Sequence, residues 1–369
     1  MGRTFFARVA AAGLAMLSLT GCQPYLLHVA LGQGDLLSRA VPIERAIADP
    51  RTSAETAEKL ALVRDAAAYA AYWGLDVGRS YRTYAALDRE ATVWTVFRAE
   101  PLALRPIQRC WPSPGCVPYQ GFFDEASAEA FAARARGRGE DVSLGPVDAY
   151  ATLGWFPDPI ASPALDRSRT ALVELVIHES AHNTVYRPGD ADFNEALANT
   201  VAFALVRAFW AERGVADDQL AAFFDERAAA RRLFFELIEA ARSELFEIYA
   251  ASEVSPGIRL QAKAAAFDRL RANYAAARPG FGAYNYDRFF AQDLNNAHLV
   301  SVGTYEDARP MLEAALYGRF GGDLRRFMRA MEAVARSDED WRLALARLGL
   351  DGAEGQRPSL QLRSTRLWL

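Results

Sequence analysis

The segment from Arg167 to Tyr186 constrains this chain of 369 residues more than any other. Apolar residues cover nearly the whole circumference of a helix drawn through it, which predicts a buried helix. These residues are Leu172, Val173, Leu175, Val176 and Ile177. Glu174, His178 and His182 recur every four residues and form one polar stripe along that helix. A buried polar stripe needs partners, and a metal ion is the partner that best suits two histidines.

The two histidines belong to the motif His178-Glu179-Ser180-Ala181-His182, and the whole chain contains four histidines. Imidazoles four residues apart share one face of a helix and can bind a single Zn²⁺. Glu179 lies beside them and can activate a zinc-bound water by accepting its proton, then return a proton to the leaving amine. The motif therefore predicts a zinc-dependent hydrolase that cleaves peptide bonds.

A catalytic zinc site needs a third protein ligand, with water in the fourth position. Our candidate is Glu195, in the segment Phe193-Asn194-Glu195 that follows the motif helix. Two alternatives are open. Glu195 could be the partner of Asp192 in a capping box, or Asp190 or Asp192 could be the ligand instead. The expected cofactor is one zinc ion bound by the two motif histidines and Glu195.

The oxyanion formed in such a reaction usually needs a hydrogen-bond donor besides the metal. Candidates lie in the segments 284–286 and 295–305, and His298 and Tyr305 are the best single choices. For each of these two residues, ordinary packing or a surface position is the alternative.

Residues 1–21 are predicted to be a lipoprotein signal peptide. Arg3 and Arg8 accompany an apolar run, Val9 to Leu19, that is too short to span a bilayer. The run ends in Leu19-Thr20-Gly21-Cys22, which resembles a bacterial lipobox and implies acylation of Cys22. We expect a lipid-anchored protein of the cell envelope that faces the periplasm, at the outer membrane. A soluble periplasmic protein with an ordinary signal peptide is the alternative.

The other two cysteines, Cys110 and Cys116, flank a turn rich in proline and glycine. An exported chain meets an oxidising compartment, so we expect a disulfide between them. Metal binding by this pair is a weaker alternative, because no further Cys or His is near them in the sequence.

Charge and length restrict the partners and the domain plan. Forty-two basic against forty-six acidic residues give a net charge of −4, and this mild acidity does not indicate nucleic-acid binding. The expected partners are a peptide substrate and the membrane reached through Cys22. We expect an anchor and linker over 22–50 and a metallopeptidase domain over 51–369. Within it, 51–150 would be a helical and β part with the disulfide, and 151–369 a helical catalytic part.

Periodicity and capping residues predict a mainly α fold with a small β component, an α+β class. Ser53 and Asp124 are predicted to cap helices, and β-branched and aromatic residues predict strands over 91–97 and 117–123, which could form a small sheet around the proposed disulfide. Long helices are expected in the second half, over 217–251, 256–277, 306–317, 323–335 and 339–348.

Several segments together resemble a bacterial family of predicted zinc aminopeptidases, most of them lipoproteins. They are Trp94-Thr-Val-Phe97, Gly115-Cys-Val-Pro-Tyr119, Ala149 to Pro159, the His178–His182 motif and Phe193-Asn-Glu195. The last segment is similar to the Asn-Glu segment of gluzincins, whose Glu is a zinc ligand. The resemblance spans nearly the whole mature chain. It implies a gluzincin-like core with His178, His182 and Glu195 on zinc and Glu179 as the base.

The chain departs from the family pattern at Ser180, where Leu is common, and at Gln120, where Arg is expected. It also lacks the Gly-x-Met-Glu-Asn segment that holds the substrate's α-amine in one large aminopeptidase family. An aminopeptidase is therefore expected from the resemblance, while the residues leave terminal and internal cleavage open.

Two other functions are consistent with the same motif. The protein could be a non-catalytic envelope lipoprotein, braced by zinc, that binds a partner. A closed structural zinc site of that kind would need a fourth protein ligand. It could also be an amidase that acts on cell-wall material.

Overall fold

The motif helix lies at the centre of the molecule, in a computed structural model that describes residues 23–110, 116–149, 156–302 and 309–347. This helix is α6 (Arg169–Thr184), and Ser168 caps it by accepting a hydrogen bond from the Ala171 amide at 3.3 Å. It packs against α4 (Ala54–Tyr72) and α7 (Ala191–Ala211). The apolar residues around α6 are buried on several sides, as the sequence predicts.

Helices dominate the described residues, and the predicted α+β class with a small β component is confirmed. The remaining helices are α2 (Gln23–Ser38), α3 (Ile43–Ala48), α5 (Glu125–Arg136), α8 (Asp217–Ala250), α9 (Pro256–Ala277), α10 (Asp287–Phe290), α11 (Asn296–Ser301), α12 (Arg309–Ala314), α13 (Leu324–Ala335) and α14 (Trp341–Arg347). Short helical turns cover Ser162–Asp166, Arg278–Phe281 and Ala315–Arg319.

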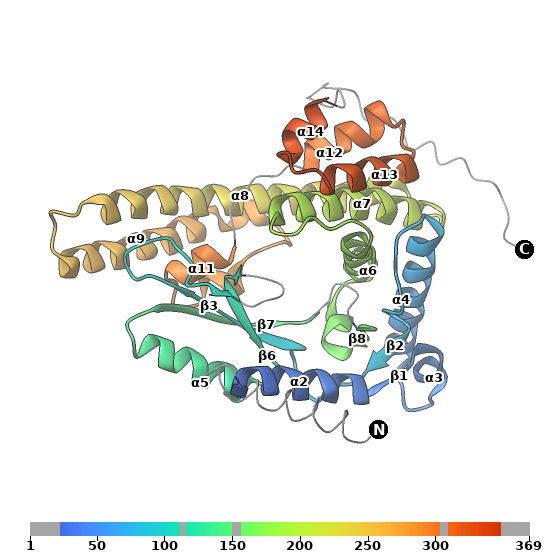
Figure 1. Cartoon of the computed structure of the whole chain (residues 1–369), viewed down its shortest axis with the longest axis horizontal. Coiled ribbons are helices and arrows are strands. Elements are labelled where there is room, and N and C mark those ends of the chain that lie inside the picture. Colours follow the sequence, from blue (N-terminus) through green and yellow to red (C-terminus); the bar gives the residue numbers. More distant parts are fainter. Residues whose placement is uncertain (1–22, 111–115, 150–155, 303–308, 348–369) are drawn as a thin grey trace, which may run out of the picture.

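The largest apolar cluster surrounds α6 and α7 and joins them to α3, α4 and the C-terminal helices. The helices α12, α13 and α14 lie over α7 in Figure 1. From α14, the fully buried Trp341 packs its ring 5.6 Å from that of Phe193, in the first turn of α7. The C-terminal helices thus fix the start of α7, the part of the helix that carries Glu195.

The strands of the described segments are short and form three small sheets. They are β1 (Ala40–Pro42), β2 (Thr83–Ala85), β3 (Val93–Ala99), β4 (Arg109–Cys110), β5 (Cys116–Val117), β6 (Tyr119–Phe122), β7 (Asp141–Val147) and β8 (Ile160–Ala161). The predicted pairing of the two strand-like segments occurs between β3 and β6, with Trp94 opposite Phe122. The strand β7 adds to the other edge of β3, giving the order β6-β3-β7.

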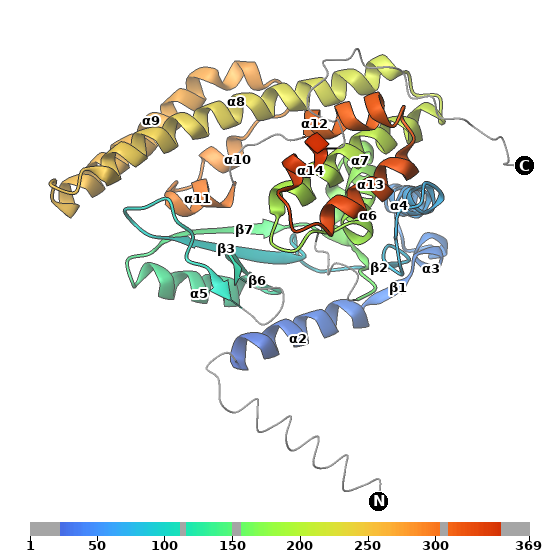
Figure 2. The same cartoon turned by 45° about the horizontal axis from the view of Figure 1, so that its top comes forward.

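The helices α5 and α11 cover opposite sides of this three-stranded sheet (Figures 1 and 2). The sheet and α5 share an apolar cluster that contains Trp94, Val96, Phe122 and Val142. Asp124 caps α5 by accepting from the Ser127 amide at 2.7 Å, as expected. The predicted disulfide between Cys110 and Cys116 is present and joins β4 to β5.

The two longest helices of the second half, α8 and α9, pack along each other and extend away from α6 (Figures 1 and 2). They share a second apolar cluster with α10 and α11. The N-terminal part of α8 contacts α7, so this helix pair connects the sheet side of the molecule to the motif helix.

Residues 23–48 differ from the expected anchor and linker. They form α2, β1 and α3, and the side chains of Leu36 and Ile43 are buried in the body of the protein. The strand β1 pairs with β2, so this segment is held by backbone hydrogen bonds as well as by apolar contacts. Among the described residues, no helix is both long enough and apolar enough to cross a membrane.

Candidate metal centre and active site

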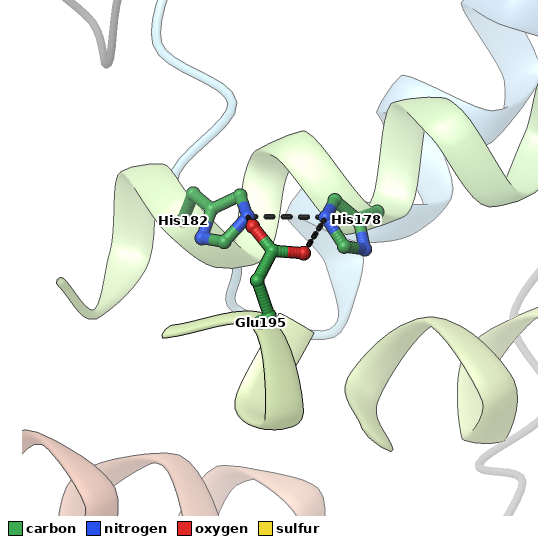
Figure 3. A group of neighbouring side chains, drawn as sticks. All are labelled: His178, His182 and Glu195. Atoms are coloured by element: carbon green, nitrogen blue, oxygen red, sulfur yellow. Dashed lines mark hydrogen bonds and ion pairs between the residues drawn. The ribbon is translucent and has the colours of Figure 1, made fainter. Parts of the chain in front are cut away.

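The side chains of His178, His182 and Glu195 come together where α6 meets α7 (Figure 3). The two Nε2 atoms of the histidines are 3.0 Å apart. The Glu195 carboxylate has Oε2 at 3.5 Å from His178 Nε2 and Oε1 at 3.4 Å from His182 Nε2. Within the described residues this is the one group of three His, Cys, Asp or Glu whose possible ligand atoms all lie close together.

In the segment Phe193-Asn194-Glu195 each side chain has a different environment, and together they position the Glu195 carboxylate. Phe193 is fully buried. Asn194 is also buried, and it holds the turn after α6, because it accepts from the Arg187 amide at 2.7 Å and donates to the Arg187 carbonyl at 2.8 Å. Glu195 is the residue of this segment that faces the histidines.

The cap of α7 distinguishes the role of Glu195 as a ligand from the alternatives, in which it belongs to a capping box or in which Asp190 or Asp192 is the ligand. The N-cap of α7 is Asp190, which accepts from the Phe193 amide at 3.0 Å and pairs with Arg187 at 3.2 Å. The expectation of a capping box between Asp192 and Glu195 is wrong, because the helix begins two residues earlier than that box requires. Asp190 is occupied as a cap, and neither Asp190 nor Asp192 belongs to the group of ligand atoms.

The electrostatics of the group favour a charged carboxylate. Burial alone would raise the pKa of Glu195, but the two imidazoles outweigh burial and hold this pKa well below its ordinary value. Burial alone would lower the pKa of His178, but Glu195 offsets it and the pKa is raised. The Glu195 side chain is 60% exposed, so one side of the group is open to solvent.

The three side chains fit a zinc ion. Bonds of 2.0–2.1 Å in a tetrahedron separate the ligand atoms by about 3.3 Å. The two Nε2 atoms lie 3.0 Å apart, each of them has a different Glu195 oxygen at 3.4 or 3.5 Å, and one ligand atom from each residue can be chosen within 4.8 Å of the others. The Nδ1 atom of His182 is buried and has no hydrogen-bond partner in the described part of the chain. The polar contacts of this ring are therefore made through Nε2, the atom that faces the group.

Glu179 lies on the same helix and lines a small cavity of about 20 Å³ together with Tyr81. A cavity of this size holds about one water molecule. Tyr81 is buried, and its φ of 60° is the only positive φ of a non-glycine residue in the described segments. Burial raises the pKa of Tyr81 well above its ordinary value, and Glu179 and Asp158 raise it further. A strained tyrosine beside the motif glutamate is a feature often found at functional sites.

The backbone of Tyr81 is fixed by the segment that approaches the motif helix. Its amide donates to the carbonyl of Asp158 at 2.9 Å, and the Asp158 amide donates to Ser80 Oγ at 3.2 Å. The segment ending at Pro159, singled out in the sequence, therefore supports the residue next to Glu179.

One exposed tyrosine lies near His182, since the ring of Tyr186 is 6.5 Å from that of His182. Tyr119 ends another of the segments singled out in the sequence. Burial raises the pKa of Tyr119, and the charge of Tyr186 raises it further.

His298, a candidate oxyanion donor, is not brought to the motif helix. It is buried in α11, where its Nδ1 accepts from the Asn295 amide at 3.2 Å in a capping box. Its Nε2 lies 3.3 Å from Gln292 Oε1. Burial lowers the pKa of His298 to about 4. These contacts give the imidazole a structural role in the helix cap.

Two other predicted residues, Tyr305 and Cys22, lie outside the described residues. Gln120, which departs from the family pattern, is buried in β6, and its Oε1 has no hydrogen-bond partner in the described segments. In the candidate segment 284–286, Tyr284 has its pKa raised by burial first, while Arg227 lowers it and Glu174 raises it. Its hydroxyl is therefore near the polar stripe of α6.

The partner of Glu174 was missed from the sequence. Arg227 of α8 donates from both terminal nitrogens to the Glu174 carboxylate, with the Nη2–Oε1 distance at 2.6 Å. The first member of the stripe is thus satisfied by an arginine fifty-three residues away rather than by the metal group. No sequence motif in α8 marks Arg227 as the partner of Glu174. No motif marks Tyr81 either.

A family model described as "Putative aminopeptidase" matches residues 24–345. No curated protein and no solved structure matches the chain. The matched region begins within α2 and ends within α14, and it includes the motif helix and Glu195.

Proposed function

The chain belongs to this aminopeptidase family, and from that membership we propose that it is a zinc-dependent peptidase with a gluzincin-like core. The observation that carries the proposal is the convergence of His178, His182 and Glu195 beside Glu179, with one possible ligand atom of each of the three within 4.8 Å of the others. The family supports a peptidase-like hydrolase, and the donor set supports the metal.

His178, His182 and Glu195 would hold one zinc ion, since two imidazoles and a carboxylate are a common ligand set of catalytic zinc. A zinc ion there would supply a Lewis acid that polarises the scissile carbonyl and lowers the pKa of a bound water towards neutrality. The two histidines are held by the buried helix α6, and Glu195 is held by its buried neighbours Phe193 and Asn194. The ligands are therefore presented by rigid elements.

Glu179 would act as the general base that takes a proton from the attacking water and then donates a proton to the leaving amine. It is half-buried, next to His178 on α6, and adjoins a cavity with room for one water. Tyr81 keeps its proton, because its pKa is raised by burial, Glu179 and Asp158. The phenol can therefore donate a hydrogen bond that orients the Glu179 carboxylate.

The open side of the group favours catalysis over a structural brace. A closed structural zinc site needs four protein ligands, whereas the cluster in the described residues has three, and Glu195 is 60% exposed. The aminopeptidase form of the activity follows from the family, and the scissile bond is that of a peptide. We infer no activity on cell-wall amides from the site.

We also propose that the protein is anchored in the cell envelope, facing the periplasm, through an acylated Cys22. The helix α2 begins directly after this cysteine and exposes Leu26, Leu27 and Leu31. Exposed leucines next to a lipid anchor suit the surface of a membrane. Membrane fractionation of the full chain and of Cys22→Ala tests this location, since the variant should leave the membrane fraction.

The function is tested by incubating the zinc-loaded mature chain, residues 23–369 without lipid, with a mixed peptide library. Products are read by mass spectrometry for the wild type, Glu179→Gln and the matched carboxylate control Asp192→Asn. Loss of the general base should lower turnover by about 10²–10⁴-fold, while Asp192→Asn, changed at an exposed residue of α7, should keep it.

Removal of single N-terminal residues by the wild type would support an aminopeptidase, and internal cuts would make the enzyme an endopeptidase. Equal turnover by Glu179→Gln would contradict the mechanism. Stoichiometric zinc without any turnover by the wild type would instead favour the non-catalytic brace.

A further inference from the structure

A pocket rich in arginine adjoins the metal group. It has a volume of about 70 Å³, and its polar lining comes from four helices. Glu174 belongs to α6, Asn199 to α7, Arg227 and Arg231 to α8, and Arg309 to α12.

The position of the pocket follows from helix geometry. Glu174 is one turn from His178 on α6, and Asn199 is one turn from Glu195 on α7. One turn of four residues advances about 6 Å along a helix axis. The pocket therefore lies about two residues of extended chain from the place where a peptide carbonyl would meet the metal group.

The charge of this pocket is opposite to that of the chain. Its lining has three arginines against one glutamate, although the whole chain has a net charge of −4. Arg309 also pairs with Glu313 at 3.4 Å, and when this glutamate is counted the three arginines and two glutamates still give 3 − 2 = +1. A concave site lined by one sign of charge concentrates ligands of the other sign.

The arginines are arranged to accept an anion. Arg227 uses two of its N–H groups on Glu174, and a guanidinium has five N–H donors in all. Arg231 is exposed where it lines the pocket. The ring of Phe203 makes a cation–π contact in this pocket, with its centre 5.0 Å from the guanidinium carbon of Arg309. Planar guanidinium groups match the two oxygens of a carboxylate.

From this pocket we propose that the enzyme binds a carboxylate of its substrate next to the scissile bond, and so prefers anionic peptides. The proposal rests on the proposed peptidase function. A space of about 70 Å³ has room for a carboxylate, because a cavity needs only about 10–15 Å³ on this measure for one water molecule.

The carboxylate can come from two sources in a peptide. An Asp or Glu side chain beside the scissile bond would make the enzyme selective for acidic residues. The C-terminal carboxylate of a short peptide would instead make it selective for dipeptides and tripeptides. Both present the same group to the arginines.

The test uses a mixed peptide library in which every member is made with a free and with an amidated C-terminus. Products are measured for the wild type, Arg231→Gln and Arg232→Gln, whose changed residue is the exposed neighbour on α8 and does not line the pocket. One charge-assisted hydrogen bond contributes about 10- to 100-fold in affinity. The wild type should prefer carboxylate-bearing members, Arg231→Gln should lose about that factor for them alone, and Arg232→Gln should behave as wild type.

The two sources give different patterns. A Glu→Gln change in the peptide removes the preference if the side chain is bound, and amidation removes it if the C-terminus is bound. An active wild type without a preference for carboxylates, or a preference that persists in Arg231→Gln, overturns the proposal.

A binding measurement separates this pocket from the peptidase function. Titration calorimetry with glutarate as the probe is made on the same three proteins in low salt. Binding by the wild type that weakens at least about tenfold in Arg231→Gln supports an anion pocket even if no peptide is cleaved. Absence of glutarate binding, together with absence of a carboxylate preference, overturns it. If Arg231→Gln proves unstable by its melting temperature, Arg309→Gln is measured in its place.

Discussion

Replacing His298 by glutamine should remove a source of acid instability and leave peptide cleavage intact. The imidazole is 4% exposed, and its Nδ1 accepts from the Asn295 amide in the capping box of α11. Burial lowers its pKa to about 4, compared with about 6.5 for an unperturbed histidine. Glutamine is the usual third residue of such a box, so His298→Gln keeps an acceptor and loses the titration.

The sign and size of the effect follow from proton linkage. Below about pH 6.5 the unfolded histidine binds a proton that the folded one refuses, so protonation favours unfolding. The stability contributed by the neutral imidazole is complete above that pH and is lost as the pH falls towards the folded pKa of about 4. A difference of about 2.5 between the two pKa values corresponds to at most about 3 kcal/mol, of which about 2 kcal/mol is lost by about pH 4.5.

Urea unfolding of the metal-free protein is measured in EDTA at about pH 7 and about pH 4.5 for the wild type, His298→Gln and His298→Ala. The alanine variant should be about 1 kcal/mol less stable than His298→Gln at both pH values, because it also loses the cap. Both variants should be about 2 kcal/mol less sensitive to acid than the wild type. An unchanged acid sensitivity in His298→Gln would refute the reasoning, and a fall in peptide turnover beyond about tenfold at neutral pH would return His298 to the catalytic site.

Three further changes have expected outcomes. Glu195→Ala should weaken zinc binding by at least about 100-fold in competition with a chelator, whereas Asp192→Asn should not; equal affinities would exclude Glu195 as a ligand. Tyr81→Phe should lower kcat about tenfold at unchanged KM, because the variant loses the hydroxyl that we propose orients the Glu179 carboxylate; a wild-type kcat would contradict that role. Replacing Cys110 and Cys116 by serine should lower the free energy of unfolding by about 2 kcal/mol through the lost loop closure, measured by urea titration without reductant.

Elements with strong local signals were predictable from the sequence. Ser53 caps α4 and Asp124 caps α5, as expected, because a side-chain oxygen before an apolar helical pattern satisfies a free amide wherever the helix packs. The β3–β6 pair was also expected from its aromatic and β-branched residues. These features depend on neighbours in sequence, so one segment at a time is enough to find them.

The strand β7 and the helix α2 lacked such signals. Gly145 and Pro146 interrupt β7, and proline is tolerated there because β7 is an edge strand, where the missing amide faces no partner. In α2 the leucines at 26, 27 and 31 stay exposed, so no apolar stripe marks the side of the helix that packs on the body. Tertiary contacts decide both elements.

The same distinction separates the metal group from the arginine pocket. The turn between α6 and α7 is short, so the chain must reverse and bring the first turn of α7 beside the last turn of α6. Glu195 was therefore within reach of His182 on spacing alone, and Asn194 secures that turn through its two hydrogen bonds to Arg187. A ligand set from two adjacent helices can be proposed from sequence because the loop length fixes how the helices meet.

In the polar stripe of α6, the partner of the histidines could be predicted from the sequence, but the partner of Glu174 could not. Burial of the stripe required partners for all three of its members, and the sequence pointed to one metal for the two histidines. Glu174 required a partner as well, but its partner Arg227 comes from α8, and Arg309 reaches the same pocket from α12. No spacing rule connects these helices, because they meet only through the packing of the whole domain. The need for a cation beside Glu174 could be deduced from the sequence, whereas its source and the pocket around it required the fold.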